Sequence, residues 1–68
     1  MTYYYADYLD RNGGYIHGTI FILYGKTETI RRAKKEANSL SNCTKLMVHL
    51  GDNDNRWFNK HGTRWYRV

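Results

Sequence analysis

The chain has 68 residues and a formal net charge of +5 at pH 7, with seven tyrosines, two tryptophans and two phenylalanines. A chain of this length buries only about 60% of its unfolded surface, so we expect one domain over residues 1–68 and no deep substrate cleft or enclosed cofactor. The positive charge excludes a mimic of DNA, which must be acidic, and favours nucleic acid, anionic lipid or an acidic protein as a partner.

Cysteine content and hydropathy bear on the compartment. Cys43 is the only cysteine, so no disulfide can form within the chain, and we expect a reducing compartment. The chain does not open with the basic and apolar segments of a secretory leader. Its longest apolar run, Ile20 to Tyr24, is too short to span a bilayer. We therefore expect a cytoplasmic protein with no membrane partner.

The first third of the chain predicts two strands. Thr2 to Asp10 is rich in tyrosine, and the turn sequence Arg11-Asn12-Gly13-Gly14 that follows tolerates positive φ, which is typical of a hairpin. A second strand is expected over Tyr15 to Tyr24, and Gly18 within it indicates a bulge or a close approach of another group. One face of this strand is expected to carry Ile16, Ile20, Ile22 and Tyr24.

From Thr27 to Leu40 the hydrophobic period changes to that of a helix. Apolar residues spaced three, four and three apart form one narrow stripe, made of Ile30, Ala33, Ala37 and Leu40. Thr27 is the expected N-cap, and Glu28 suits the positive start of the helix. The helix is expected to end near Ser39.

The remaining residues predict a return to strands. Lys45 to Gly51 alternates, with Leu46, Val48 and Leu50 directed inward, and Asp52 to Asn55 reads as a turn. Arg56 to Lys60 and Thr63 to Val68 are expected to pair as a last hairpin. The order ββαββ(β) predicts an α+β fold, a mostly antiparallel sheet of four to five strands with one helix packed on one face.

The closing segment, Arg56 to Val68, interleaves aromatic rings with cations. Flat rings beside forked cationic donors suit phosphate backbones, stacked bases and acidic protein surfaces. The alternative is that Trp57 and Trp65 are cross-strand core residues and that the arginines keep a sheet edge soluble. We expect Trp65 to be structural. We assign binding to Arg56, Trp57, Lys60 and Arg64.

The basic face of the helix is a second candidate surface. Four cations occupy five positions, namely Arg31, Arg32, Lys34 and Lys35. Only Glu28 and Glu36 offset them within the helix. Such a run is either a solvated face or a surface that follows phosphates or an acidic protein. We assign Arg31, Arg32 and Lys35 to binding.

The spacing of potential metal ligands is not that of a metal site. The pool of ligands is Cys43, His17, His49, His61, Asp52 and Asp54. None of the intervals matches a zinc framework. The run Asp52 to Arg56 lacks the glycine and the twelfth-position glutamate of a calcium loop. We expect no metal and no cofactor.

Catalytic and nucleotide-binding patterns are also incomplete. Cys43 stands just before a strand, where a buried filler is more typical than a nucleophile, and no orienting third group is indicated. Asp7 and Asp10 lie three apart on a strand, so they point to opposite faces. Gly25-Lys26-Thr27 precedes a helix but lacks the spacing of a nucleotide loop. We expect no enzyme and no small-molecule substrate.

The predicted architecture and the residues Trp57, Lys60, Gly62, Arg64 and Trp65 resemble the small phage-encoded anti-CRISPR proteins. The chain is most similar to those acting on the type I-F guide complex, over its whole length in architecture and over the last dozen residues in motif. The tyrosine-rich first strand has no counterpart in this likeness. The resemblance implies a stoichiometric inhibitor in the cytoplasm of an infected bacterium. It would bind the guide-RNA surveillance complex, a ribonucleoprotein, block target DNA binding, and contact DNA non-specifically through positive side chains.

Two other functions stay open on the residues alone. A free-standing basic nucleic-acid-binding module, or a small transcription regulator, would use tyrosine and tryptophan for stacking and the helix for phosphates. A small metal-independent enzyme ranks last. Salt-dependent binding to arbitrary DNA favours the module, whereas tight binding to one protein complex without affinity for DNA favours the inhibitor.

Overall fold

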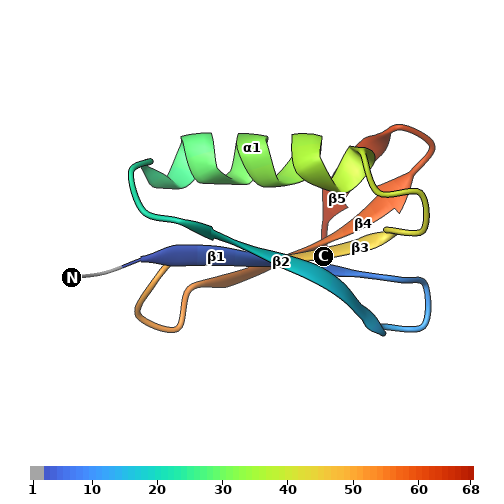
Figure 1. Ribbon diagram of the computed structural model, residues 1–68, viewed down its shortest axis with the longest axis horizontal. Helices are drawn as coiled ribbons and strands as arrows, with labels where there is room; N and C mark the ends of the chain where they lie inside the picture. The colour runs from blue at the N-terminus through green and yellow to red at the C-terminus, as the bar shows by residue number, and fades with distance from the viewer. Residues whose placement is uncertain (1–2) are drawn as a thin grey trace.

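The computed structural model describes residues 3–68 and has the α+β fold expected from the sequence. Five strands form one antiparallel sheet in the order β2-β1-β3-β4-β5, and the single helix α1 lies across one face of it (Figure 1). The elements are β1 Tyr4–Leu9, β2 Tyr15–Phe21, α1 Lys26–Asn38, β3 Lys45–His49, β4 Asn55–His61 and β5 Arg64–Arg67. Thr2, which the expected first strand included, lies outside the described residues.

The two hairpins expected from the sequence, β1–β2 and β4–β5, close through glycine in the left-handed region. In the turn between β1 and β2, Gly13 has φ of 82°, and the Asp10 carboxylate accepts hydrogen bonds from the backbone N–H groups of Asn12 and Gly14. In the turn between β4 and β5, Gly62 has φ of 64°. A residue without Cβ adopts these angles without strain, so the expected hairpin positions are confirmed.

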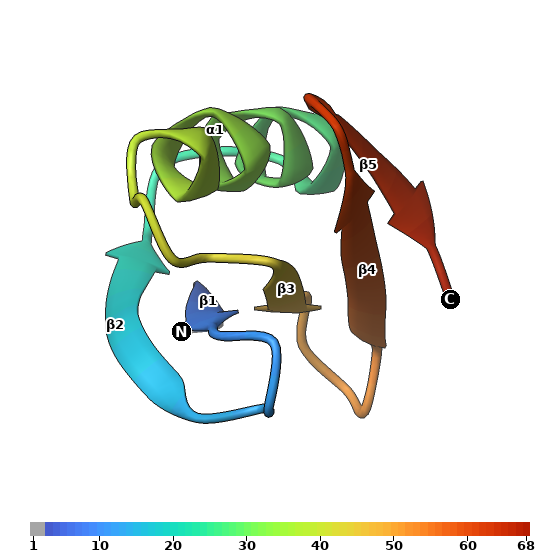
Figure 2. The same ribbon diagram turned by 90° about the vertical axis from the view of Figure 1, so that its right-hand side faces the viewer.

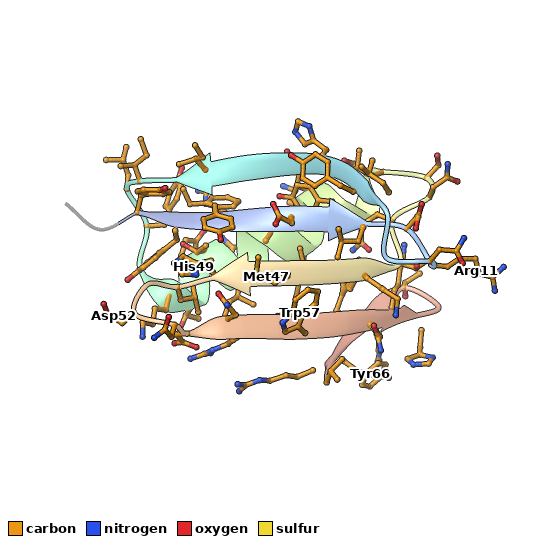
Figure 3. The ribbon with its side chains drawn as sticks, turned by 90° about the horizontal axis from the view of Figure 1, so that it is seen from below. Arg11, Met47, His49, Asp52, Trp57 and Tyr66 are labelled. Atoms are coloured by element: carbon orange, nitrogen blue, oxygen red, sulfur yellow. The ribbon has the colours of Figure 1, made fainter. Side chains whose placement is uncertain are left out.

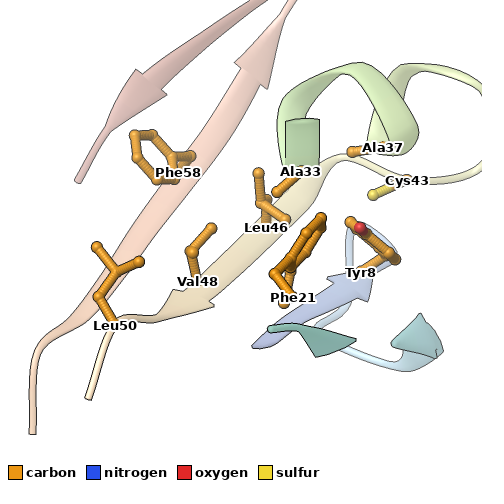
Figure 4. Close-up of a cluster of buried hydrophobic side chains, with 10 residues drawn as sticks. Tyr8, Phe21, Ala33, Ala37, Cys43, Leu46, Val48, Leu50 and Phe58 are labelled. Carbon is orange, nitrogen blue, oxygen red and sulfur yellow. The ribbon is translucent and has the colours of Figure 1, made fainter. Parts of the chain in front are cut away.

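The core lies between α1 and the face of the sheet that α1 covers (Figure 4). The helix contributes Ala33 and Ala37, both fully buried, so its backbone sits close to the strands. Ile30 and Leu40, the outer members of the expected apolar stripe, pack at the margin of this core. The strands contribute Ala6, Tyr8, Phe21, Leu46, Val48 and Phe58, with Cys43 and Leu50 from the connections.

Two local predictions are wrong. The second strand ends at Phe21 rather than Tyr24, because Phe21 pairs with Tyr4, the first residue of β1, and the ladder has no further partner. The helix begins at Lys26 with Gly25 as its N-cap, and no side chain caps it, so Thr27 lies inside the first turn. The Thr29 N–H donates to the Gly25 carbonyl at 3.0 Å and closes that turn earlier than expected.

Candidate binding surface

The face of the sheet away from α1, which we call the open face, carries three rows of side chains. Residues alternate across each strand, and directly paired residues share a face. Tyr8, Leu46 and Phe58 point to the helix, so their neighbours in the chain point away from it. The rows are Ile20–Tyr5–His49–Asn55, Gly18–Asp7–Met47–Trp57 and Tyr15–Leu9–Lys45–Asn59–Tyr66.

Met47 and Trp57 lie near the middle of the open face, and Tyr66 lies toward its β5 side (Figure 3). We define the aromatic cluster as Tyr5, Tyr15, Met47, Trp57 and Tyr66. Three of its rings are well exposed, at 67% for Tyr15, 51% for Tyr66 and 48% for Trp57. Met47 lies between Asp7 and Trp57 in the central row and is buried. Tyrosine, tryptophan and methionine are enriched in protein interfaces, which makes this cluster the leading candidate for recognition.

Polar contacts hold several open-face side chains in place. The Tyr5 ring stacks on His49 with centroids 4.7 Å apart, and His49 Nδ1 lies 2.6 Å from Asn55 Oδ1. Lys45 Nζ donates to Asn59 Oδ1 at 3.4 Å. Rings fixed in this way lose little conformational freedom when a partner docks, which favours affinity.

The seven residues to which the sequence analysis assigned binding lie on different surfaces of the structure. Trp57 belongs to the aromatic cluster, and Arg64 lies on the same side of the sheet beside His61. Arg56 and Lys60 alternate with Phe58 and are therefore on the helix-covered side of β4. The remaining three, Arg31, Arg32 and Lys35, lie on the exposed side of α1. A single flat partner cannot contact all seven at once.

Several of these cations already have acidic partners. Glu28 binds Arg31 at 2.6 Å and Arg32 at 2.7 Å, and its hydrogen bond to Arg31 is the main reason that its pKa lies below the usual range. The Arg32 guanidinium also covers the Tyr24 ring at 4.1 Å. The basic face of the helix is therefore partly neutralised.

Two cations at the turn between β3 and β4 are also paired with an acidic residue. Asp54 binds Lys26 at 3.1 Å and Arg56 at 3.4 Å. Hydrogen bonds from these two cations, first from Lys26 and then from Arg56, lower the pKa of the Asp54 carboxyl. Arg56 is about 70% buried at its side chain, so this contact fixes the turn and leaves little of Arg56 for a partner.

Lys35, Lys60 and Arg64 make no ion pair within residues 3–68. The Lys60 ammonium lies 5.8 Å from the centre of the Trp65 ring, on the covered side of the sheet. Lys35 and Arg64 are exposed. The positive charges of these three cations are therefore not neutralised by an ion pair within residues 3–68, and they stay candidates for binding.

Trp65 and Trp57 differ in position as the sequence led us to expect. Trp65 packs against the core, and its Nε1–H donates to Asn38 Oδ1 at 2.9 Å, which ties β5 to the end of α1. Trp57 faces away from the core and has no such contact among the described residues. The first ring packs against the fold, and the second is 48% exposed to solvent.

Chemistry-bearing groups outside the open face are few. Cys43 is buried, its Sγ donates to the Lys45 carbonyl at 3.3 Å, and burial raises the pKa of its thiol, which disfavours the thiolate. Within residues 3–68, no three histidine, cysteine or acidic side chains gather as a metal site would require. In the same residues, no helix has the length and apolar character to cross a membrane.

Four members of the aromatic cluster were missed by the sequence interpretation, namely Tyr5, Tyr15, Met47 and Tyr66. A signal for two of them was present, because Leu46 and Val48 directed inward force Met47 outward, and a strand rich in tyrosine must expose alternate rings. These patterns indicate a shared surface only once the strand order is known, because that order brings β1 and β4 to the two sides of β3.

Comparison with protein-family models, with curated proteins and with solved structures finds no match for this chain. Its function is therefore inferred from its residues and their geometry.

Proposed function

We propose that the chain is a stoichiometric, non-catalytic inhibitor that binds a guide-RNA surveillance complex in the cytoplasm of an infected bacterium and prevents it from binding target DNA. The observation that supports a docking function most strongly is the exposed aromatic cluster on the open face. The likeness of Trp57, Lys60, Gly62, Arg64 and Trp65 to small anti-CRISPR proteins supports the choice of target.

The open face suits docking on a protein surface for three physical reasons. Its rings project from a hydrogen-bonded sheet, so the backbone that carries them is ordered before binding. Trp57 and Tyr66 each offer a large apolar area with a polar atom at the edge, which is typical of residues that anchor interfaces. Arg64, two residues before Tyr66 on the same strand, can approach an acidic rim or the phosphates of a bound guide.

The test is the binding of target DNA by a purified type I-F guide-RNA complex in the presence of increasing amounts of the chain. We expect target binding to be blocked once the chain matches the complex in molar amount. Trp57→Ala should weaken the inhibition at least about tenfold, as expected for a central aromatic anchor.

The matched control is Leu23→Ala, because Leu23 is 90% exposed in the connection after β2 and lies outside the aromatic cluster. This variant should inhibit like the unmodified chain. Full target binding in the presence of excess chain would refute the proposed target. Equal inhibition by Trp57→Ala and the unmodified chain would refute the proposed surface.

A second candidate, a nucleic-acid-binding module, is favoured by one observation. At the end of the molecule where the β1–β2, α1–β3 and β4–β5 connections meet, Arg11, Lys45 and Lys60 border a depression of about 280 Å³ with no acidic residue in its lining (Figure 1). None of the three forms an ion pair within residues 3–68. Binding of the isolated chain to arbitrary DNA, weakening steeply with salt, would favour this function.

A further inference from the structure

The two edges of the sheet are protected very differently. The edge strand β5 has four residues, of which Arg64 and Arg67 are charged. The edge strand β2 has seven residues, YIHGTIF, with no lysine, arginine, aspartate or glutamate, and the chain has no proline. Short, charged edges resist pairing with another strand, whereas long uncharged edges invite it. Figure 2 shows β2 and β5 at opposite sides of the sheet.

Three side chains along β2 are also apolar and open to solvent. Ile20 is 63% exposed, Tyr15 is 67% exposed and Ile16 is 37% exposed. Leu9 of β1 pairs with Tyr15 and Tyr8 pairs with His17, so the register shifts here and leaves Ile16 without a direct partner in β1. The outer edge of β2 therefore combines unpaired backbone groups with exposed isoleucines.

These residues are arranged symmetrically around Gly18. Ile16 and Ile20 stand two positions before and after it: Ile20 pairs with Tyr5 on the open face, and Ile16 is the residue left over at the register shift. Gly18 has no side chain of its own, and a Cβ there would meet the Tyr15 hydroxyl at 2.6 Å, so the Tyr15 side chain fills the space at Gly18. A strand with this sequence is complementary to an antiparallel copy of itself.

We propose that β2 is a homodimerisation edge, where a second copy of the chain adds its own β2 antiparallel across a two-fold axis at Gly18. Ile16 of each copy then lies opposite Ile20 of the other, and His17 lies opposite Thr19. Cross-strand pairs of β-branched residues stabilise antiparallel sheets. The two five-stranded sheets become continuous, and the contact uses the same surface on both copies, so it closes as a dimer.

Charge favours this seam over other contacts between copies. Each copy carries +5, and β2 itself contributes no cation. Arg32 and Lys35 of α1 do line the groove beside Thr19 and Ile20, but they share it with the Glu36 carboxylate. A contact of β2 with β5 would place the two arginines of β5 at the seam and leave an open chain of copies. Because the remaining repulsion between copies is long-range, we expect added salt to strengthen the dimer.

The dimer leaves the aromatic cluster exposed, so this inference goes beyond the proposed function and is tested without a guide-RNA complex. The measurement is the molar mass of the full chain in solution as a function of concentration, by sedimentation or light scattering. We expect the mass to rise from one chain to two. Ile20→Lys should weaken self-association at least about tenfold, while the melting temperature at low concentration stays unchanged because Ile20 is exposed.

The matched control is Ile22→Lys, since Ile22 is 60% exposed but lies after the end of β2. It should dimerise like the unmodified chain. A mixture of the single variants Ile16→Glu and Ile20→Lys tests the register, because opposite charges then face each other only between the two variants. Within one chain the two positions are roughly 13 Å apart and cannot pair.

We expect the mixture to form dimers under conditions in which each variant alone is monomeric. Three results would overturn the proposal: one-chain mass at every concentration of the unmodified chain, dimerisation of Ile20→Lys at the unmodified strength, or a mixture that stays monomeric. A different register would place Ile20 opposite itself, and mixing would then bring no rescue.

Discussion

The two faces of this sheet are built from alternate residues of the same strands, yet they differ in what their side chains contact. On the covered face, Leu46, Val48 and Phe58 meet the alanines of α1 and are shielded from water. On the open face, Trp57, next to Phe58 in the chain, is 48% exposed, and Met47, between Leu46 and Val48, is buried only among the side chains of that face. The small helix residues draw α1 close to one face, while residues 3–68 provide no second layer for the other.

This difference separates stability from recognition at the level of single residues. A change on the covered face removes buried contacts and creates a cavity in a small core. A change on the open face removes a group that the folded chain hardly uses. The difference between the faces can therefore be tested with substitutions at two adjacent residues of one strand. Residues that share features of both faces provide further tests.

Trp65 gives the largest expected effect among these intermediate residues, because it belongs to the closing aromatic segment but lies on the covered face. We expect Trp65→Ala to lower the free energy of unfolding by about 3 kcal/mol, out of a total of about 5 kcal/mol for a domain of this size. Asn38→Ala, which removes only the hydrogen bond to Nε1, should cost about 1 kcal/mol. Denaturant unfolding measures both, and an unchanged stability of Trp65→Ala would contradict its assignment to the core.

The basic side of α1 tests whether recognition extends beyond the open face. We expect the triple variant Arg31→Ala, Arg32→Ala, Lys35→Ala to remain folded, since exposed changes cost under about 0.5 kcal/mol each. Its affinity for the partner should fall about tenfold, or about 1.4 kcal/mol. Glu28→Gln, which releases Arg31 and Arg32 from their acidic partner, should instead strengthen binding. A triple variant that binds like the unmodified chain would remove this side of α1 from the interface.

Tyr8 is an exception within the covered face. Its hydroxyl is buried near the side chains of Thr19 and Glu36 but has neither of them at hydrogen-bond geometry, and burial raises its pKa. Above the ordinary tyrosine pKa of about 10, the unfolded chain loses this proton while the native chain keeps it, so stability falls as pH rises.

We expect Tyr8→Phe to raise the free energy of unfolding by about 1 kcal/mol at neutral pH. As the pH rises above about 10, this variant should lose less stability than the unmodified chain. Thermal melts at neutral and alkaline pH measure both effects. The control is Tyr66→Phe, at an exposed ring, which should keep the alkaline loss of the unmodified chain. A destabilised Tyr8→Phe variant would show that the hydroxyl has a partner in solution.

Most of the fold was predictable because its elements follow local rules. The alternation of Leu46, Val48 and Leu50 identified β3 and its inward face, and the spacing of Ala33 and Ala37 identified the packed side of α1. The end of β2 was not predictable, since it depends on where β1 begins to pair. The helix start was misplaced because Thr27 has the chemistry of a cap, while the backbone turn closes at Gly25.

The candidate site was predicted only in part, because it depends on strand order and on ion pairs. Trp57 was identified as a candidate anchor from the closing segment. The other members of the aromatic cluster come from β1, β2, β3 and β5, and only the strand order and register show that they share its face of the sheet. Arg31 and Arg56 were assigned from charge alone, and charge alone does not reveal that Glu28 and Asp54 bind them.

Trp57 and Phe58 provide the most direct test, because they are adjacent in β4 and point to opposite faces, with Trp57 48% exposed and Phe58 5% exposed. The measurement is the melting temperature and the partner affinity of Trp57→Ala and Phe58→Ala side by side. We expect Phe58→Ala to lose about 3–5 kcal/mol of stability, and Trp57→Ala to keep its melting temperature but lose at least about tenfold in affinity. A Trp57→Ala variant that unfolds, or one that binds as tightly as the unmodified chain, would contradict the division of the sheet into a structural and a recognition face.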